Sequence, residues 1–240
     1  MEVKRSKAGL FLHQTKYSLD LLQKCNMVGS KPCSSPCTPG AKLSITDGEP
    51  VSNPTEYRSL VGALQYLTWS RPEIAYAVNR VCQFMHSPTT VHLSSAKRIL
   101  RYIKGTLGHG ILFTKGLSAI SGYCDADWAG DPDTRRSTSG FCLFFSNNPI
   151  SWSAKKQPTV SRSSTEDEYK CLVSTAVEVL WAVFTLMYTD SSGQLTCEVS
   201  CFDWFCLLIQ AVLSVSDTAL PMCFISFLFN KEFHFLISSK

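Results

Sequence analysis

The sequence of 240 residues predicts an α+β protein, in which a helical unit precedes a small sheet and a long helix. Three observations support this fold class. Apolar residues recur with helical spacing between residues 54 and 106, and the pattern changes to strand-like alternation between residues 110 and 154. A second helical pattern then runs from Thr165 to Tyr188. We therefore expect the long helix to pack on a largely antiparallel sheet.

The N-terminal segment predicts one strand and one helix. The strand is GLFLHQ, residues 9–14, and the helix follows over residues 14–27 with Thr15 as its cap and an Asp20–Lys24 pair. Residues 30–54 are rich in Pro, Gly and Ser and have no apolar period, so they predict an extended connector. Its CSSPC motif lacks a second Cys or His pair at zinc-finger spacing, which favours a loop over a zinc site.

Three helices are predicted after the connector. Asn53 as N-cap, Pro54 and Glu56 begin the first, whose apolar stripe is Tyr57, Leu60, Val61, Leu64 and Leu67. It ends before Arg71, and Pro72 begins the second. Residues 91–106 predict the third, with Gly105 as C-cap and a basic stripe of Lys97, Arg98, Arg101 and Lys104.

Four short strands are predicted next, separated by turn sequences. They are residues 111–115, 119–127, 139–146 and 149–154. The long helix follows, and we expect Thr165 to be its N-cap, with Glu168 completing a capping box three residues later.

Charge and cysteine content limit the functional classes. The formal net charge is +4, and residues 191–240 hold only two of the 23 basic residues, so the basic excess lies before this tail. This charge permits contact with a polyanion without requiring it. Eleven scattered cysteines and the lack of a secretory signal indicate a reducing, intracellular compartment.

The tail, residues 191–240, departs from the preceding pattern. It holds two apolar runs, residues 205–215 and 219–229, and both are shorter than the roughly 18 to 20 residues of a membrane span. A membrane partner is therefore not expected. The favoured interpretation is a divergent hydrophobic stretch, such as translation beyond a broken reading frame, rather than an element selected to fold with the rest.

The motif GYCDADWAG, residues 122–130, contains the main candidate for chemistry. Asp125 and Asp127 lie one residue apart near the end of a predicted strand, and carboxylates are costly to bury unless they are paired or bind a metal. Glu168, in the first turn of the long helix, could converge with Asp125 at one end of the sheet. Converging carboxylates bind Mg²⁺. The alternatives are a solvated acid at a strand end and a glutamate that only caps its helix.

Several long phrases of the sequence carry a family resemblance. They are QTKYSLDLL, YRSLVGALQYLTWSRPEIAYAV, RILRYIKGT, GYCDADWAGDPDTRRSTSGF and SWSAKKQPTVSRSSTEDEY. From Met1 to about Trp181, about three quarters of its length, the chain resembles the C-terminal part of the Pol polyprotein of Ty1/copia-type retrotransposons of plants. The resemblance implies that residues 1–114 are the end of a reverse transcriptase beyond its palm. It also implies that residues 115–190 are a truncated ribonuclease H-like domain, with an incomplete mixed sheet and a packed helix. Residues 191–240 are then the divergent tail.

The family reaction is Mg²⁺-dependent cleavage of the RNA strand in RNA–DNA hybrids. The resemblance therefore implies Mg²⁺ as cofactor, nucleic acid as partner and no small-molecule substrate. Asp125 and Glu168 match the family's catalytic metal ligands, whereas Asp127 does not. The basic stripe named above, together with Arg135 and Arg136, would contact nucleic acid, and the alternative is a solvated charged face.

The chain also departs from the family pattern. It contains no Asp-Asp dipeptide, so we expect no polymerase activity, and no family phrase for the later ribonuclease H acids follows Trp181. Asp203 is a loose candidate for the third carboxylate, although chance is the favoured explanation. The missing strand would pair with the Asp125 strand, leaving an edge open to aggregation. We expect little or no nuclease activity, with a non-catalytic nucleic-acid-binding module or a decayed remnant as alternatives.

Overall fold

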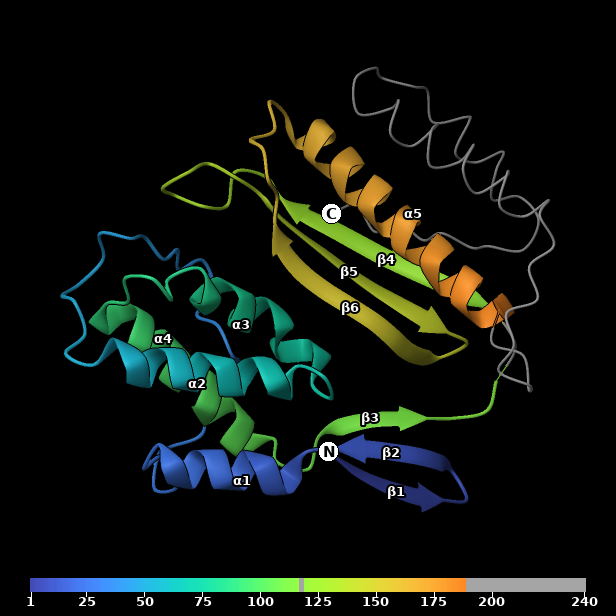
Figure 1. The fold of residues 1–240 in the computed structure, drawn as a ribbon, viewed down its shortest axis with the longest axis horizontal. Helices are drawn as coiled ribbons and strands as arrows, with labels where there is room; N and C mark the ends of the chain where they lie inside the picture. Colours follow the sequence, from blue (N-terminus) through green and yellow to red (C-terminus); the bar gives the residue numbers. More distant parts are fainter. Residues whose placement is uncertain (117–118, 189–240) are drawn as a thin grey trace.

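The computed structural model describes residues 1–116 and 119–188 and confirms the α+β fold class. Figure 1 shows helices α1–α4 gathered on one side and a second sheet covered by α5 on the other. The elements in chain order are β1 (Glu2–Ser6), β2 (Gly9–His13), α1 (Thr15–Lys24), α2 (Pro54–Leu67), the 3₁₀ turn η1 (Pro72–Ile74), α3 (Ala75–Cys82), α4 (Thr90–Gly105), β3 (Gly110–Phe113), β4 (Ile120–Asp127), β5 (Thr138–Phe145), β6 (Asn148–Lys156) and α5 (Ser164–Tyr188).

The described strands form two antiparallel sheets with the orders β1-β2-β3 and β4-β5-β6. The sequence did not predict β1, whose residues are mostly exposed and charged and so lack the apolar alternation of a strand. The predicted strand ILFTK corresponds to β3, which pairs with β2 in the N-terminal sheet. This pairing brings the end of the helical unit back to the start of the chain. The described strands include none that pairs in parallel, although the resemblance implies a mixed sheet, and β4 pairs with β5 alone among them.

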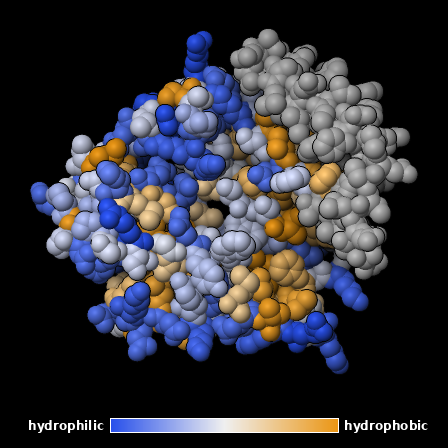
Figure 2. All heavy atoms as spheres, in the orientation of Figure 1, coloured by the Kyte–Doolittle hydropathy of each residue, from blue (hydrophilic) through white to orange (hydrophobic). Residues whose placement is uncertain are grey.

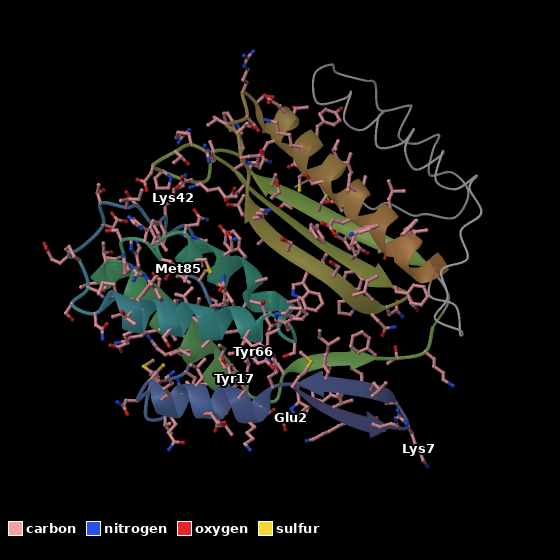
Figure 3. The ribbon with its side chains drawn as sticks, viewed as in Figure 1. Glu2, Lys7, Tyr17, Lys42, Tyr66 and Met85 are labelled. Atoms are coloured by element: carbon pink, nitrogen blue, oxygen red, sulfur yellow. The ribbon has the colours of Figure 1, made fainter. Side chains whose placement is uncertain are left out.

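The helical unit has the larger of two hydrophobic cores. All five predicted stripe residues of α2 are buried, and they pack against apolar residues of α3 and α4. The predicted cap is confirmed, because Asn53 accepts a hydrogen bond from the Glu56 N–H at 3.3 Å. The rings of Tyr17 and Tyr66 meet edge to face, with centroids 4.9 Å apart, and so join α1 to α2 (Figure 3). In Figure 2 the surface of this side is mainly hydrophilic, and hydrophobic residues gather over β2 and β3.

Arg71 does more than mark the end of the preceding helix, which is all that the sequence predicted for it. Its side chain is 2% exposed and donates to the Thr106 carbonyl at 3.1 Å and to the Thr106 hydroxyl at 2.5 Å. Its Nε also pairs with Glu73 at 2.5 Å. The guanidinium therefore ties the end of α2 to the end of α4, with its charge compensated as a buried cation requires.

The second core lies between α5 and the sheet β4–β6. Its buried members are Ile120, Leu143 and Val179. Gly122 of β4 leaves room for the Leu143 side chain of β5, since a Cβ added there would lie 2.9 Å from Leu143 Cδ2, while Val179 Cγ2 of α5 would be in ordinary contact at 3.5 Å. A larger residue at this position would displace the Leu143 side chain.

Three predicted caps were wrong. Thr15 is the first residue of α1, and its hydroxyl instead donates to the Leu107 carbonyl at 3.1 Å. Gly105 is the last residue of α4 and Thr106 is the C-cap. Ser163, not Thr165, accepts from a first-turn amide, that of Glu166, at 3.1 Å, while the Glu166 carboxylate accepts from the Arg162 N–H at 2.8 Å.

Hydrogen bonds from two segments of the first half, among other contacts, reach the second sheet and its turns. Trp152 of β6 donates its indole N–H to the Thr68 carbonyl at the end of α2, at 2.9 Å. Asp133, in the turn between β4 and β5, accepts from the Ser44 hydroxyl at 2.5 Å and from the Ile45 N–H at 2.8 Å. The connector after α1 thus also contacts the second half of the molecule.

The predicted tail, with Asp203, lies outside the described residues. Within residues 1–116 and 119–188, no helix combines the length and the apolar character that a membrane crossing needs.

Candidate carboxylate site

Asp125 and Glu168 line the same groove. Asp125 comes from β4 and Glu168 from the second turn of α5, whose start is fixed by the Ser163 cap. The groove has a volume of about 1110 Å³ and runs between the second sheet, the first turns of α5 and the segment η1–α3. Figure 2 shows the surface hollowed between the two halves of the molecule. The two residues thus share one cavity wall, and their joint role as metal ligands stays a prediction.

The electrostatics of Glu168 reflect this arrangement. Burial raises the pKa of its carboxyl, the negative charge of Asp125 raises it further, and Asp167 adds a smaller effect in the same direction. Because the charge of Asp125 raises the pKa of Glu168, the two carboxylates lie close enough to repel each other. A bound cation would relieve that repulsion.

The groove has an unusual composition for a surface that would meet phosphates. Its described lining includes no Lys, Arg or His, while its charged members are the acids Glu73, Asp125 and Glu168. The aromatic side chains that complete the wall are Tyr76, Tyr123, Phe141, Trp152 and Tyr169. Without a bound cation, such a wall repels a phosphodiester, so anion binding here would depend on a metal ion.

Asp125 and Glu168 are the carboxylates that the described groove offers to a metal ion, because the third acid, Glu73, is paired with Arg71. No cluster of three or more His, Cys, Asp or Glu suited to a metal occurs in residues 1–116 and 119–188. Two carboxylate oxygens suit Mg²⁺, which keeps several waters and is often held by one or two carboxylates together with substrate phosphates. Asp125 and Glu168 thus fit the ion in ligand chemistry, in a site short of one acid.

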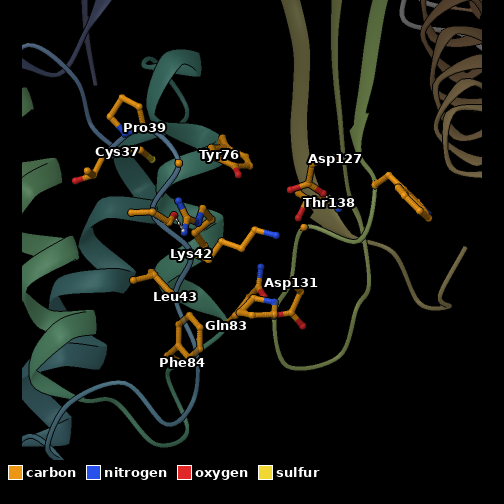
Figure 4. Close-up of a pocket in the computed structure, with 17 residues that line it drawn as sticks. Cys37, Pro39, Lys42, Leu43, Tyr76, Gln83, Phe84, Asp127, Asp131 and Thr138 are labelled. Atoms are coloured by element: carbon orange, nitrogen blue, oxygen red, sulfur yellow. Dashed lines mark hydrogen bonds between the residues drawn. The ribbon is translucent and has the colours of Figure 1, made fainter. Parts of the chain in front are cut away.

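Asp127 faces a different hollow from Asp125. It lines a cavity of about 400 Å³ with Lys42, Tyr76 and residues of the connector (Figure 4). Its carboxylate accepts a hydrogen bond from the Thr138 N–H. Burial raises the pKa of Asp127, and the Thr138 N–H opposes that effect. The two acids of GYCDADWAG therefore have separate roles, and Asp127 holds the start of β5.

The sequence analysis did not identify Asp167 as a buried acid. This side chain is fully buried in the first turns of α5, where Oδ1 lies 3.4 Å from the Ser161 hydroxyl. Oδ2 is also buried and has no hydrogen-bond partner among the described residues. Its spacing from Cys171 and Thr175, at four and eight residues, places all three on the inward face of the helix and was the available signal.

Three residues of the predicted basic stripe contact the connector. Arg101 donates to the Lys31 carbonyl at 2.7 Å, and Lys104 donates to the Ser30 carbonyl at 2.5 Å. Arg98 contacts the Ser35 hydroxyl at 3.2 Å. The remaining predicted nucleic-acid contacts, Lys97, Arg135 and Arg136, are exposed. The stripe on α4 thus has a structural task in holding the connector.

Comparison with known proteins gives the family. Over 182 residues, or 75% of this chain, it is 51% identical to a retrovirus-related Pol polyprotein from transposon RE1 of Arabidopsis thaliana, and 48% identical to that from transposon RE2. It is also 50% identical over 183 residues to an uncharacterized mitochondrial protein of the same plant, covering 76% of each chain. No protein-family model and no solved structure matches the chain.

These relatives include transposon-encoded polyproteins, and the identities extend over most of this chain. The chain belongs to the family of Ty1/copia-type retrotransposon Pol polyproteins of plants. It spans about 12% of the length of the RE1 and RE2 polyproteins.

Proposed function

We propose that this chain is a Pol polyprotein fragment that keeps part of a ribonuclease H site, with Asp125 and Glu168 as ligands of Mg²⁺. Its substrate would be the RNA strand of an RNA–DNA hybrid. One observation carries the proposal: the two carboxylates line one groove, and the charge of Asp125 raises the pKa of Glu168. Residues 1–114 would correspond to the end of a reverse transcriptase, and residues 115–190 to the truncated nuclease domain.

The residues of the groove would act by binding and orientation. A bound Mg²⁺ would activate a water molecule and stabilise the leaving oxygen. Asp125, on a strand paired along its length with β5, provides a carboxylate fixed by the sheet. Glu168 provides the second from α5, and its position depends on where the Ser163 cap starts that helix. The aromatic wall would exclude water on one side and give a nucleotide a surface on which to lie.

Low activity follows from the ligand count. With two carboxylates among the described residues, a metal ion would rely on water and substrate for its remaining ligands. We therefore expect weak hybrid cleavage at most, stronger with Mn²⁺ than with Mg²⁺, because transition-metal ions bind a given set of oxygen ligands more tightly.

The test is cleavage of a labelled RNA–DNA hybrid by the full chain in each metal. Asp125→Asn should lower the rate by roughly 100-fold, the order expected for several kcal/mol of lost metal stabilisation. Asp20→Asn, at an exposed position on α1, is the matched control and should change nothing. An Asp203→Asn variant shows whether the tail supplies a third ligand. Cleavage that persists in Asp125→Asn, or that needs no metal, would refute the proposal.

A second candidate function is hybrid binding without cleavage. It is favoured by the exposure of Lys97, Arg135 and Arg136, which do not share the connector contacts of the other basic residues. Affinity should then fall steeply between about 50 and 200 mM salt, and neutralising Arg135 and Arg136 should reduce the salt slope by about two. Absence of binding at low salt would exclude this candidate.

A further inference from the structure

The connector covers a small cavity between α3 and α4. The cavity has a volume of about 40 Å³, and its lining comes from residues 36–43 of the connector and from both helices. The connector bends there through a turn in which the Ala41 N–H donates to the Thr38 carbonyl at 3.3 Å, and Gly40 adopts a positive φ of 70°. Figure 4 shows the same stretch of connector where it also walls the neighbouring cavity. The small cavity shares no lining residue with the carboxylate groove, so it is a separate site.

Two arginines line this cavity from different helices. Arg80 comes from α3 and Arg98 from α4. Arg80 donates to the Ala41 carbonyl at 2.5 Å, and its guanidinium lies over the Tyr76 ring, 5.8 Å from the centroid. Arg98 donates to the Ser35 hydroxyl at 3.2 Å, while its Nε is buried and has no hydrogen-bond partner among the described residues. A buried donor on a charged group is costly to leave unpaired, so the cavity lacks an acceptor.

The described lining of the cavity supplies no negative charge. It includes no Asp or Glu, and within residues 1–116 and 119–188 neither arginine forms an ion pair. Burial raises the pKa of the Cys37 thiol in the cavity wall, although the charges of Arg80 and Arg98 oppose this effect, so the thiol is neutral at pH 7. Burial also raises the pKa of Asp127 in the neighbouring cavity, and Arg80 opposes that effect from beyond ion-pair distance. Two positive charges therefore border a space that calls for an anion.

The size of the cavity limits the ligand. A single water needs about 10–15 Å³ of such space, so a cavity of about 40 Å³ holds roughly three water-sized groups. This volume suits the oxygens of a small oxyanion. Sites for larger organic ligands usually measure about 300–1,000 Å³, so the sugar and base of a nucleotide have no room here. The guanidinium fork is the side-chain group best suited to hold such an oxyanion through paired hydrogen bonds.

We propose that Arg80 and Arg98 bind a free oxyanion of the phosphate class beneath the connector. The anion accepts hydrogen bonds from both guanidinium groups, including the unpaired Nε of Arg98. It thereby joins α3 to α4 and compensates the two charges. Because the same arginines also hold the Ala41 carbonyl and the Ser35 hydroxyl, a bound anion fixes the connector over the cavity. The inference does not depend on the proposed nuclease function, since the two sites have separate linings.

The first test measures protection of Cys37, which lines the cavity, in the folded full chain. Inorganic phosphate is titrated at constant ionic strength, and the rate at which iodoacetamide alkylates each cysteine is followed by mass spectrometry. Alkylation of Cys37 should slow in a saturable way, by about tenfold at a phosphate concentration ten times the Kd. Cys142, a half-buried cysteine in the carboxylate groove, is the internal control and should keep its rate.

The second test uses variants and the thermal midpoint. Phosphate at about twenty times the Kd should raise the midpoint of the wild-type chain by roughly 5 °C. Phosphate also stabilises folded proteins in general, so the difference between variants measures the part that belongs to the site. Arg98→Gln should lose this part together with the protection of Cys37. Arg5→Gln, the same change at an exposed position of β1, should keep both.

Three results would overturn the proposal. One is a rate of Cys37 alkylation that stays constant up to about 50 mM phosphate, where even a millimolar site is filled. Another is equal slowing of Cys37 and Cys142, which would show a general effect of the salt. The third is protection of Cys37 by an RNA–DNA hybrid but not by phosphate, which would assign the arginines to nucleic acid. All three are read from the wild type, so they do not depend on the folding of a variant.

Discussion

His92 shows how a single side chain can make stability depend on pH. It is fully buried, its ring stacks on Phe84 with centroids 3.8 Å apart, and its Nδ1 accepts from the Thr89 N–H at 3.0 Å. Nε2 therefore carries the proton and donates to the Ser44 carbonyl at 3.0 Å. A second proton would have to enter at Nδ1, against a backbone donor.

We predict that acidification destabilises the protein partly through His92. Burial lowers the pKa of His92 in the folded state, although the Ser44 carbonyl opposes this effect. The unfolded state then binds the proton more readily, so the stabilisation is complete above about pH 6.5 and is lost as the pH falls through the folded-state pKa. Urea unfolding at pH 7.5 and pH 5 measures this loss. His92→Gln should flatten the dependence, and the exposed His109→Gln should not; equal slopes in all three proteins would contradict the prediction.

Residues whose partners are close in sequence were predictable, and residues with distant partners were not. The Asn53 cap was correct because its signal, Asn-Pro-x-Glu, is complete within four residues. Arg71 was missed as a buried clamp because Thr106 lies 35 residues away. For the candidate site, the sequence placed Asp125 and Glu168 near one end of the sheet, and both line one groove. The contact of the Cys171 thiol with the Asp125 carbonyl depends on the exact rotation of α5, which periodicity alone does not fix.

At the scale of elements, the start of α5 decides where Glu168 points. We predict that Ser163→Ala removes the N-cap and costs about 1 kcal/mol of stability. Thr165→Ala should be close to neutral, because Thr165 is exposed and lies inside the helix. Urea unfolding of both variants makes the comparison. If Thr165→Ala were the costly change, the capping seen at Ser163 would be wrong.

Strand pairing illustrates the limit of sequence patterns at this scale. The strands of the second sheet were located by their alternation, and neighbours in sequence pair there through short turns. In the first sheet, β2 pairs with β3, which follows about a hundred residues later. β1 pairs through backbone groups while its side chains stay exposed, so it carries no apolar signal.

At the scale of the whole molecule, the two halves have unequal cores. The helical unit buries a large cluster of apolar residues, whereas the apolar cluster described between α5 and its sheet has three buried members, Ile120, Leu143 and Val179. The stability of the second half should therefore depend on its contacts with the first. The indole of Trp152, which reaches the Thr68 carbonyl, is one such contact.

We predict that Trp152→Phe loosens the second sheet without loosening the helical unit. Loss of one buried hydrogen bond is worth about 1 kcal/mol, so amide exchange in β5 and β6 should speed up roughly fivefold while that in α2 and α4 stays unchanged. Trp128→Phe is the matched control, because Trp128 donates its indole N–H to the Ser161 carbonyl within the same half, at 3.3 Å. Faster exchange throughout the chain would mean that the two halves unfold as one cooperative unit. Unchanged exchange in β5 and β6 would mean that their small core is sufficient, and that the carboxylate groove is held together by α5 and its sheet alone.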